Sequence, residues 1–279
     1  MIKRLSVAAA MVAAQLIFSL PLVEAKDKLI MGVHPYKPPV EVHKIFKPIA
    51  EYIAKETGKQ IEVQIGQTYE DAVTKIGTGV FDFAYLGPTL YVDAQKQYGL
   101  VPLAMVANNG IPTFHGVIAV KKGGATTSLA QLKGKKFAFG ERHSTLNHVI
   151  PLWMLLNAGV KLTDLKEHGF LKTHDNIAMN IIRGAFDAGG LQPDIAEKYR
   201  AQGLEVIATS PELPEHVFVA TKSLDAATAK AIQNALNSEK AAPVLKGIKG
   251  SISGAPKFTD ADFNMLRKIM TEVGPYLDK

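Results

Sequence analysis

Apolar residues recur with two different periods in the first part of the chain after its N-terminal leader. A short apolar run at Lys28–Val33 and the alternation of polar and apolar residues at 60–65 both predict β-strands. Between them, Ile45, Ile49 and Ile53 fall on one helical stripe, which indicates an amphipathic helix. The elements predicted here are strands at 28–33, 60–65 and 100–105 and helices at 42–57 and 89–97. This β-α-β order implies a mostly parallel sheet.

Two twenty-residue segments share one pattern. Residues 69–88 read YEDAVTKIGTGVFDFAYLGP and residues 174–193 read HDNIAMNIIRGAFDAGGLQP. Aligned without a gap, the identical pairs are Ile76 and Ile181, Gly79 and Gly184, Phe81 and Phe186, Asp82 and Asp187, Leu86 and Leu191, and Pro88 and Pro193. Each copy reads as a helix, a glycine stop and a strand that ends near proline. Two such units predict two similar lobes around a ligand cleft, because open α/β sheets bind ligands beyond the carboxyl ends of their strands. The alternative is that the matches reflect a common helix-to-strand pattern.

The second half of the chain predicts an inserted lobe. Two extended apolar runs, at 113–120 and 216–221, enclose this lobe and are expected to be its entry and exit strands, and hence the hinge. The other elements predicted here are a short helix at 128–132, a helix at 144–158, strands at 136–140 and 204–209, and a helical tail from residue 223. The expected division is 26–114 with 216–279 for lobe 1 and 115–215 for lobe 2. The fold class expected is α/β, with two similar lobes, a central cleft and two hinge strands.

The first 25 residues have the form of a secretory signal peptide. Lys3 and Arg4 precede an apolar stretch, and Val23-Glu24-Ala25 fits the small-x-small rule for cleavage after Ala25. We therefore expect the mature protein to begin near Lys26 and to lie in the periplasm. A membrane anchor is the alternative, but an alanine-rich segment that ends at a small-residue site favours cleavage.

Composition narrows the classes of function. The chain has no cysteine, which excludes disulfides, thiolate metal sites and cysteine nucleophiles. Its formal charge is +6, and without Lys3, Arg4 and Glu24 it is 30 − 25 = +5, a mild excess that can favour an anionic ligand. No stripe of Lys and Arg with interleaved aromatics is present, so we expect no nucleic-acid partner. The sequence contains no G-x-S-x-G, H-E-x-x-H or phosphate-loop motif, and its eight histidines lack metal-ligand spacing, so we expect no catalytic residue, metal or cofactor.

Three segments carry candidate chemistry for an anion. A predicted strand ends at Gly140 and a helix opens at Ser144-Thr145, where free backbone N–H groups and hydroxyl donors can hold an anion, although an ordinary N-cap is the commoner case. Tyr69 and His174 occupy equivalent places in the repeat, so both are expected at strand-to-helix turns that face the cleft. Either can donate a hydrogen bond to an oxyanion, and His174 more strongly when protonated.

Two further expectations concern the scaffold. Asp82 and Asp187 recur in both copies at the start of a strand, which favours a structural role. Pro151 lies seven residues into the helix predicted at 144–158, so we expect it to kink this helix and to free a backbone carbonyl.

The segments taken together resemble the phosphate/phosphite/phosphonate-binding family of periplasmic substrate-binding proteins of ABC transporters. The matching pieces are GVHPYKPP with FKPIAEYIAKETGK, GVFDFAYLGP, FHGVIAVKKG, LKGKKFAFG with the Ser-Thr pair after it, and HDNIAMNIIRGAFDAGG. They follow one another in the family's order over nearly the whole mature chain. The resemblance implies a type II periplasmic-binding-protein fold that closes on its ligand.

The same resemblance implies ligand-binding roles for individual residues. A tyrosine, a Ser-Thr-Ser helix start and a histidine hold the phosphorus oxyanion in this family, and these roles fall on Tyr69, Ser144, Thr145 and His174. The chain departs from the pattern where Leu146, followed by Asn147, replaces the third hydroxyl. It also has Phe114 where the entry hinge often carries tyrosine, and His216 where phosphonate binders can carry an aspartate. The remaining candidates are Tyr85 and Asp194, the latter at a place where phosphonate binders can keep an acid for the ligand's amine.

The function expected from these features is the capture of phosphonate, phosphite or phosphate between two lobes and its delivery to the membrane permease of an ABC transporter, by a monomer. A periplasmic ligand-sensing partner of a signalling receptor and a binder of another small anion are the alternatives. An enzyme on a similar two-lobe fold, such as a transferase, would need a nucleophile or an acid/base pair in the cleft.

Overall fold

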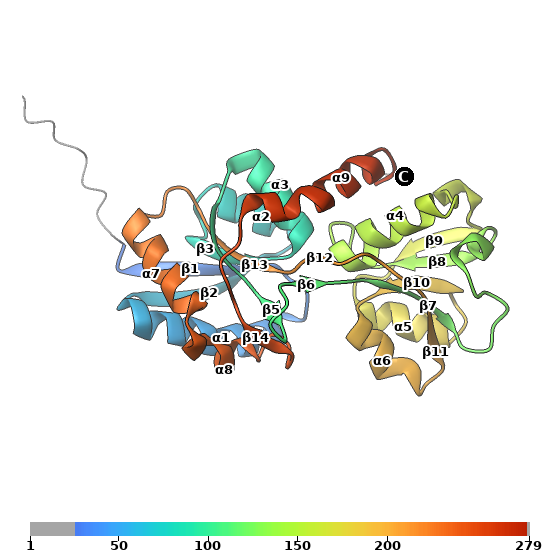
Figure 1. Cartoon of the computed structure of the whole chain (residues 1–279), viewed down its shortest axis with the longest axis horizontal. Helices are drawn as coiled ribbons and strands as arrows, with labels where there is room; N and C mark the ends of the chain where they lie inside the picture. The colour runs from blue at the N-terminus through green and yellow to red at the C-terminus, as the bar shows by residue number, and fades with distance from the viewer. Residues whose placement is uncertain (1–25, 278–279) are drawn as a thin grey trace, which may run out of the picture.

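The computed structural model describes residues 26–277, so the predicted signal peptide lies outside the described residues. Two α/β lobes lie side by side and are joined by extended segments (Figure 1). This is the expected α/β fold with two similar lobes. Among the described residues, no helix is long and apolar enough to span a membrane.

Lobe 1 is built on a five-stranded sheet in the order β2-β1-β3-β13-β4. Its strands are β1 (Lys28–Val33), β2 (Gln60–Ile65), β3 (Phe83–Leu86), β4 (Val101–Met105) and β13 (Val217–Ala220). Only β13 runs antiparallel to its neighbours, so the prediction of a mostly parallel sheet is confirmed. The helices of this lobe are α1 (Pro39–Thr57), α2 (Tyr69–Gly77), α3 (Pro88–Tyr98), α7 (Ala226–Asn237) and the short α8 (Ala242–Leu245). Helices α1 and α7 cover one face of the sheet, and α2 and α3 cover the other.

Lobe 2 repeats this architecture. Its sheet has the order β9-β8-β10-β7-β11, again with one antiparallel strand, β7, next to the edge strand. The strands are β7 (Val117–Lys121), β8 (Lys136–Phe139), β9 (Glu167–Phe170), β10 (Ala188–Leu191) and β11 (Leu204–Thr209). The helices are α4 (Ile150–Asn157), α5 (His174–Ile182) and α6 (Pro193–Arg200), with a short 3₁₀ turn at Leu129–Leu132.

The sequence repeat corresponds to a structural repeat, α2-β3 in lobe 1 and α5-β10 in lobe 2. Asp82 Oδ2 accepts a hydrogen bond from the Ile30 N–H at 2.8 Å, and Asp187 Oδ2 accepts one from the Lys136 N–H at the same distance. In each lobe the aspartate therefore ties the start of one parallel strand to its neighbour. The matching pair supports the expected structural role of both aspartates.

Two short strands connect the lobes. β6 (Thr113–Phe114) pairs antiparallel with β12 (Leu213–Pro214), and both lie between the sheets in Figure 1. The extended run expected at 113–120 is thus interrupted after Phe114, because β6 pairs in the connection whereas β7 pairs in lobe 2. A second small pairing, of β5 (Ala107–Asn108) with β14 (Ile252–Gly254), lies below the connection.

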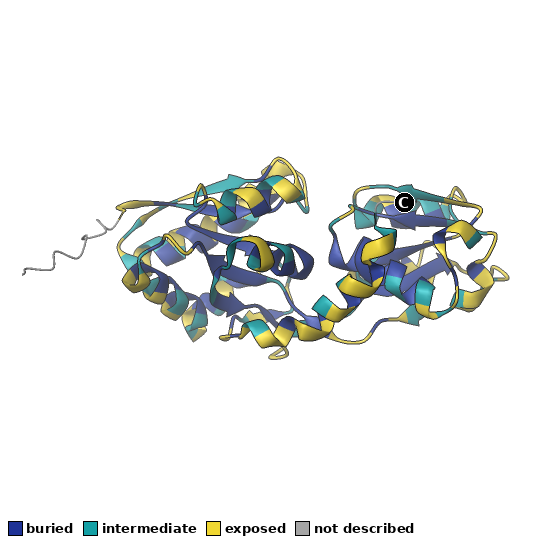
Figure 2. Ribbon diagram, turned by 90° about the horizontal axis from the view of Figure 1, so that it is seen from above, coloured by how far each residue is buried: buried dark blue, intermediate teal, exposed yellow. Residues whose placement is uncertain are grey.

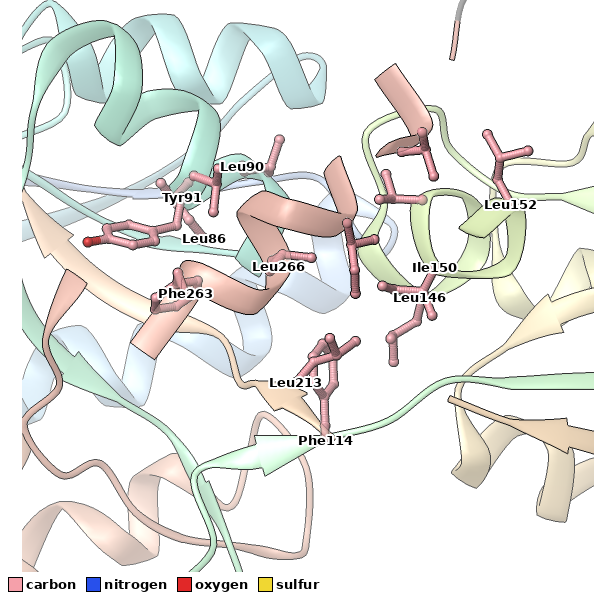
Figure 3. Close-up of a cluster of buried hydrophobic side chains, with 14 of the residues drawn as sticks. Leu86, Leu90, Tyr91, Phe114, Leu146, Ile150, Leu152, Leu213, Phe263 and Leu266 are labelled. Atoms are coloured by element: carbon pink, nitrogen blue, oxygen red, sulfur yellow. The ribbon is translucent and has the colours of Figure 1, made fainter. Parts of the chain in front are cut away.

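One apolar cluster continues from lobe 1 through the connection into lobe 2 (Figure 3). Its labelled side chains include Leu90 of lobe 1, Phe114 and Leu213 of the connecting strands, and Ile150 of lobe 2. The C-terminal helix α9 (Asn264–Val273) contributes Leu266 and packs against both α3 and α4. The buried residues form the interior of each lobe, and exposed residues follow the outer helices (Figure 2). Packing against a shared helix therefore joins the lobes on one side.

Candidate functional site

A cleft of about 1270 Å³ lies between the lobes. The loops that line it follow the carboxyl ends of parallel strands in both sheets, as expected for an open α/β sheet. All nine residues singled out from the sequence line it: Tyr69, Tyr85, Phe114, Ser144, Thr145, Asn147, His174, Asp194 and His216. Their roles differ, because several are already engaged by other protein groups.

A stack of aromatic rings forms the lobe 1 wall of the cleft. The rings of His216 and Tyr85 stack with centroids 5.3 Å apart and planes within 8°, and His34 stacks on both. Phe114 meets His216 edge-on at 5.5 Å, so the connecting strand closes one side of the stack. Tyr85 is buried, and burial raises the pKa of its phenol well above the ordinary value, so the group stays protonated.

His216 is anchored by the residue before it. Its Nδ1 lies 2.7 Å from Glu215 Oε2, and its backbone N–H donates to the same oxygen. Glu215 is buried and also accepts from Asn108 Nδ2 at 2.8 Å. Burial pushes the pKa of Glu215 upward, but the electrostatic interaction with His216 and these hydrogen bonds outweigh it, so that the pKa lies below its usual value. Glu215 is therefore an ionised carboxylate, and His216 Nδ1 carries a proton.

Tyr69 and His174 are the first residues of α2 and α5 and approach the cleft from different lobes. Each follows a threonine N-cap, Thr68 or Thr173, whose hydroxyl accepts a backbone N–H three residues on. This common start places both side chains at the sheet edge, as the repeat predicts. Burial, followed by the charge of Glu141, raises the pKa of Tyr69, which keeps the phenol available as a donor.

The structure assigns a neutral ring to His174. The Gln192 N–H points at His174 Nδ1 at 3.2 Å, so Nδ1 accepts and Nε2 carries the proton. Burial lowers the pKa of His174 to about 4, although Asp194 and Asp175 oppose the shift. The ring therefore donates through Nε2–H without being an imidazolium.

The Ser-Thr segment does not form an ordinary helix start. Thr145–Val149 is one π-helical turn, in which the N–H groups of Val149 and Ile150 donate to the carbonyls of Ser144 and Thr145, and regular α4 begins only at Ile150. Neither hydroxyl caps the helix, so the alternative of an ordinary N-cap is wrong. Ser144 is 9% exposed, lines the cleft and makes no capping hydrogen bond, which leaves its hydroxyl available as a donor.

The Thr145 hydroxyl is hydrogen-bonded to Thr89 of lobe 1. Its hydroxyl lies 2.8 Å from the Thr89 hydroxyl and accepts from the Thr89 N–H at 3.2 Å. Thr89 in turn donates to the His143 carbonyl at 2.7 Å. Since the single Thr89 proton goes to His143, the Thr145 proton is directed to Thr89. Thr145 thus joins the lobes in this conformation, rather than offering a free donor.

Asn147 holds the loop that precedes the turn. Pro151 has no N–H to give the Asn147 carbonyl, so this carbonyl is released from the helix as predicted and accepts from the Gly140 N–H at 2.8 Å instead. Asn147 Oδ1 accepts from Glu141 N–H at 3.1 Å. A Cβ at Gly140 would lie 2.1 Å from the Asn147 side chain, so any larger residue at this position would clash with Asn147.

Two further pairs of basic and acidic side chains approach one another across the cleft. Lys249 Nζ lies 3.8 Å from Asp194 Oδ1, and His143 Nε2 lies 2.8 Å from Glu70 Oε1. In each pair the two residues come from different lobes. Asp194 therefore has a basic partner, and its carboxylate is a cross-lobe contact as well as part of the cleft wall.

Sequence reasoning missed His34, Tyr36 and Thr89. The first two lie in the loop after β1, and the repeat could have indicated this loop, since it corresponds to the loop after β8 that holds Ser144. Among residues 26–277 no group of three or more His, Cys, Asp or Glu could hold a metal ion. The cleft is instead lined by neutral donors, aromatic rings and paired charges.

The fold and the cleft define a two-lobe periplasmic binding protein. The chain belongs to the family described as ABC transporter, phosphonate, periplasmic substrate-binding protein, whose model matches residues 31–263. The family is one of periplasmic transport proteins, which act with an ABC transporter.

Individual relatives agree with this assignment. The chain is 29% identical over 229 residues to a probable ABC transporter phosphite-binding protein, PhnD1, of Prochlorococcus marinus, with 75% of each chain covered. The solved structure of Prochlorococcus PhnD1 in complex with methylphosphonate superposes with a TM-score of 0.79 at 22% identity, covering 89% of this chain and 98% of that one. A binding-protein component of an ABC phosphonate transporter from Pseudomonas aeruginosa superposes with a TM-score of 0.75 at 17% identity, covering 87% and 85%. These two structures show the shared fold.

Proposed function

We propose that this protein captures a small phosphorus oxyanion, namely phosphonate, phosphite or phosphate, between its lobes and delivers it to the permease of an ABC transporter. The observation that carries the proposal is the placement of Tyr69 and His174, equivalent positions of the repeat, on different lobes of one cleft. Both present neutral donors, as does Ser144. An anion between them accepts from both lobes, and this favours the closed state over the open one.

The other residues of the proposed site have supporting roles. Asn147 orders the loop that carries Ser144, Thr145 sets the approach of the lobes, and Asp194 pairs with Lys249. Phe114, Tyr85 and His216 form the aromatic wall. We assign no catalytic role, metal or nucleic acid to the protein and expect a monomer, with lobe 1 formed by 26–114 and 216–279 and lobe 2 by 115–215. The leader is expected to be removed after Ala25, which N-terminal sequencing of exported protein tests.

A panel of melting curves tests the ligand class. The protein is unfolded, dialysed and refolded to remove any bound ligand, then heated with phosphite, phosphate, methylphosphonate, sulfate, nitrate or acetate. A ligand bound only by the native state stabilises it by about 2.7 kcal/mol at a hundredfold excess over Kd. We expect at least one phosphorus oxyanion to raise the melting temperature. Stabilisation by another ligand class alone would show that the phosphorus assignment is wrong.

A further inference from the structure

Two imidazole nitrogens converge on an open space beside Gly87. A Cβ built on Gly87 would lie 3.6 Å from His216 Nε2 and 3.7 Å from His34 Nε2. Gly87 has φ −69° and ψ 157°, a conformation that any residue adopts, so the backbone itself does not require glycine. The space lies in the wall of the cleft, next to Tyr69, whose ring centroid is 5.2 Å from that of His34. The absence of a side chain at Gly87 therefore leaves room for one ligand atom beside the Nε2 atoms of the two rings.

His34 presents a hydrogen-bond acceptor to this space. Its Nδ1 lies 3.2 Å from the Tyr85 carbonyl, which can only accept, so Nδ1 carries the proton and Nε2 carries a lone pair. The side chain is 2% exposed. Burial, followed by the electrostatic interaction with His216, lowers the pKa of His34 to about 3, so that the ring remains neutral.

No neighbouring carboxylate is free to change this assignment. The titratable groups in ring contact with His34 are Tyr36, Tyr69, Tyr85 and His216. Glu215, behind His216, already accepts from Asn108 and from two groups of His216. His34 Nε2 is thus a hydrogen-bond acceptor, whereas Tyr69, Ser144 and His174 present donors.

We propose that the cleft selects the singly protonated form of its phosphorus oxyanion, with the P–OH group donating to His34 Nε2 in the space beside Gly87. This inference rests on the proposed function and adds the protonation state of the bound ligand and the residue, His34, that accepts its proton in a hydrogen bond. The unprotonated oxygens of the ligand accept from Tyr69, Ser144 and His174. An alkylsulfonate has the same shape and charge as an alkylphosphonate monoanion but no proton to donate. A bound alkylsulfonate would leave the buried His34 Nε2 without a hydrogen-bond donor. A site that loses a buried hydrogen bond in this way binds the analogue much more weakly.

The test compares methylphosphonate with methanesulfonate by calorimetry on refolded protein, at a pH where methylphosphonate is mainly a monoanion. We expect methanesulfonate to bind at least about a hundredfold more weakly. His34→Phe keeps a ring in the stack but removes Nε2, and we expect it to bring the affinity ratio close to one. Equal affinity of the wild-type protein for both ligands, or an unchanged ratio in a folded His34→Phe variant, overturns the inference.

A second variant, Gly87→Ala, tests the inference even if His34→Phe does not fold. Gly87→Ala adds only an ordinary van der Waals contact, so the fold should be retained, but its methyl group occupies the space assigned to the P–OH. We expect at least a tenfold loss of methylphosphonate affinity with an unchanged melting temperature. Gly254→Ala, where a Cβ meets nothing within 4 Å and which lies outside the cleft lining, is the matched control. Normal methylphosphonate binding by Gly87→Ala overturns the placement, whereas failure of every phosphorus ligand with the wild-type protein refutes the proposed function and the inference together.

Discussion

The hydroxyl of Thr145 in lobe 2 lies 2.8 Å from the hydroxyl of Thr89 in lobe 1. Because Thr89 also donates to the His143 carbonyl, the three groups form one chain of hydrogen bonds across the cleft. Side-chain hydroxyls that look like anion donors in the sequence thus serve first to set the approach of the lobes.

Thr145→Ala and Thr89→Ala are each expected to weaken ligand binding by about 1 kcal/mol, because each removes the hydrogen bond between the two hydroxyls. The double variant should lose less than the sum of the two single variants, since the two side chains share this hydrogen bond. Calorimetry on the three variants measures this coupling. A Thr145→Ala loss much larger than that of Thr89→Ala would show that Thr145 binds the ligand directly.

Tyr69→Phe and His174→Ala each remove one proposed donor to the oxyanion. Hydrogen bonds to charged groups contribute about 1.5–3 kcal/mol, so we expect either change to raise Kd by at least about tenfold. Tyr98→Phe is the control, since Tyr98 lies outside the cleft lining. Wild-type affinity in both Tyr69→Phe and His174→Ala, measured on folded protein, would refute the proposed site.

The two repeated aspartates should affect stability and not binding. Asp82 is 3% exposed and also accepts a hydrogen bond from Lys26, whereas Asp187 is exposed. Removing the Asp82 carboxylate therefore leaves the Ile30 N–H without its partner, and this group is less easily hydrated than the Lys136 N–H that Asp187 bonds. We expect Asp82→Ala to cost about 1–3 kcal/mol of unfolding free energy and Asp187→Ala about 1 kcal/mol or less. Chemical denaturation gives both values, with ligand affinity as the control. Loss of binding by Asp187→Ala at full stability would contradict the structural role.

Stability should fall as the solution is acidified, in part through His148. Its Nδ1 lies 2.6 Å from the Arg142 carbonyl, and burial lowers its pKa from 6.5 to about 4. The unfolded chain therefore binds an extra proton between these values, and the native state loses up to about 1.4 kcal/mol per pH unit in that window.

His148→Phe tests this contribution, because phenylalanine can keep the edge contacts with Phe139 and Phe170. Denaturation curves from pH 7 to pH 4 should show a shallower loss of stability in the variant. Parallel curves for the two proteins would mean that His148 does not contribute to the pH dependence.

The strands and lobes could be predicted because their signals are local. Lys28–Val33 has the same bounds in sequence and structure, and the Asp82 and Asp187 positions share one hydrogen-bonding pattern. The π-helical turn could not be predicted, because it depends on how Pro151, Gly140 and Asn147 meet in space.

The acceptor in the cleft could not be predicted for a similar reason. His34 lies in a loop without periodicity, and its neighbour His216 precedes β13, a strand that returns from the far end of the chain to pair with β3. The tautomer of His34 depends on the Tyr85 carbonyl, a main-chain group that no residue pattern indicates. Site chemistry of this kind arises only from tertiary contacts.

Calorimetric titration of refolded, ligand-free protein with phosphite, phosphate and methylphosphonate tests the central claim most directly. We expect saturable 1:1 binding of at least one of them, lost or greatly weakened in the Tyr69→Phe, His174→Ala double variant at an unchanged melting temperature. The absence of binding by all three to correctly folded protein, or equal binding by the double variant, would contradict it.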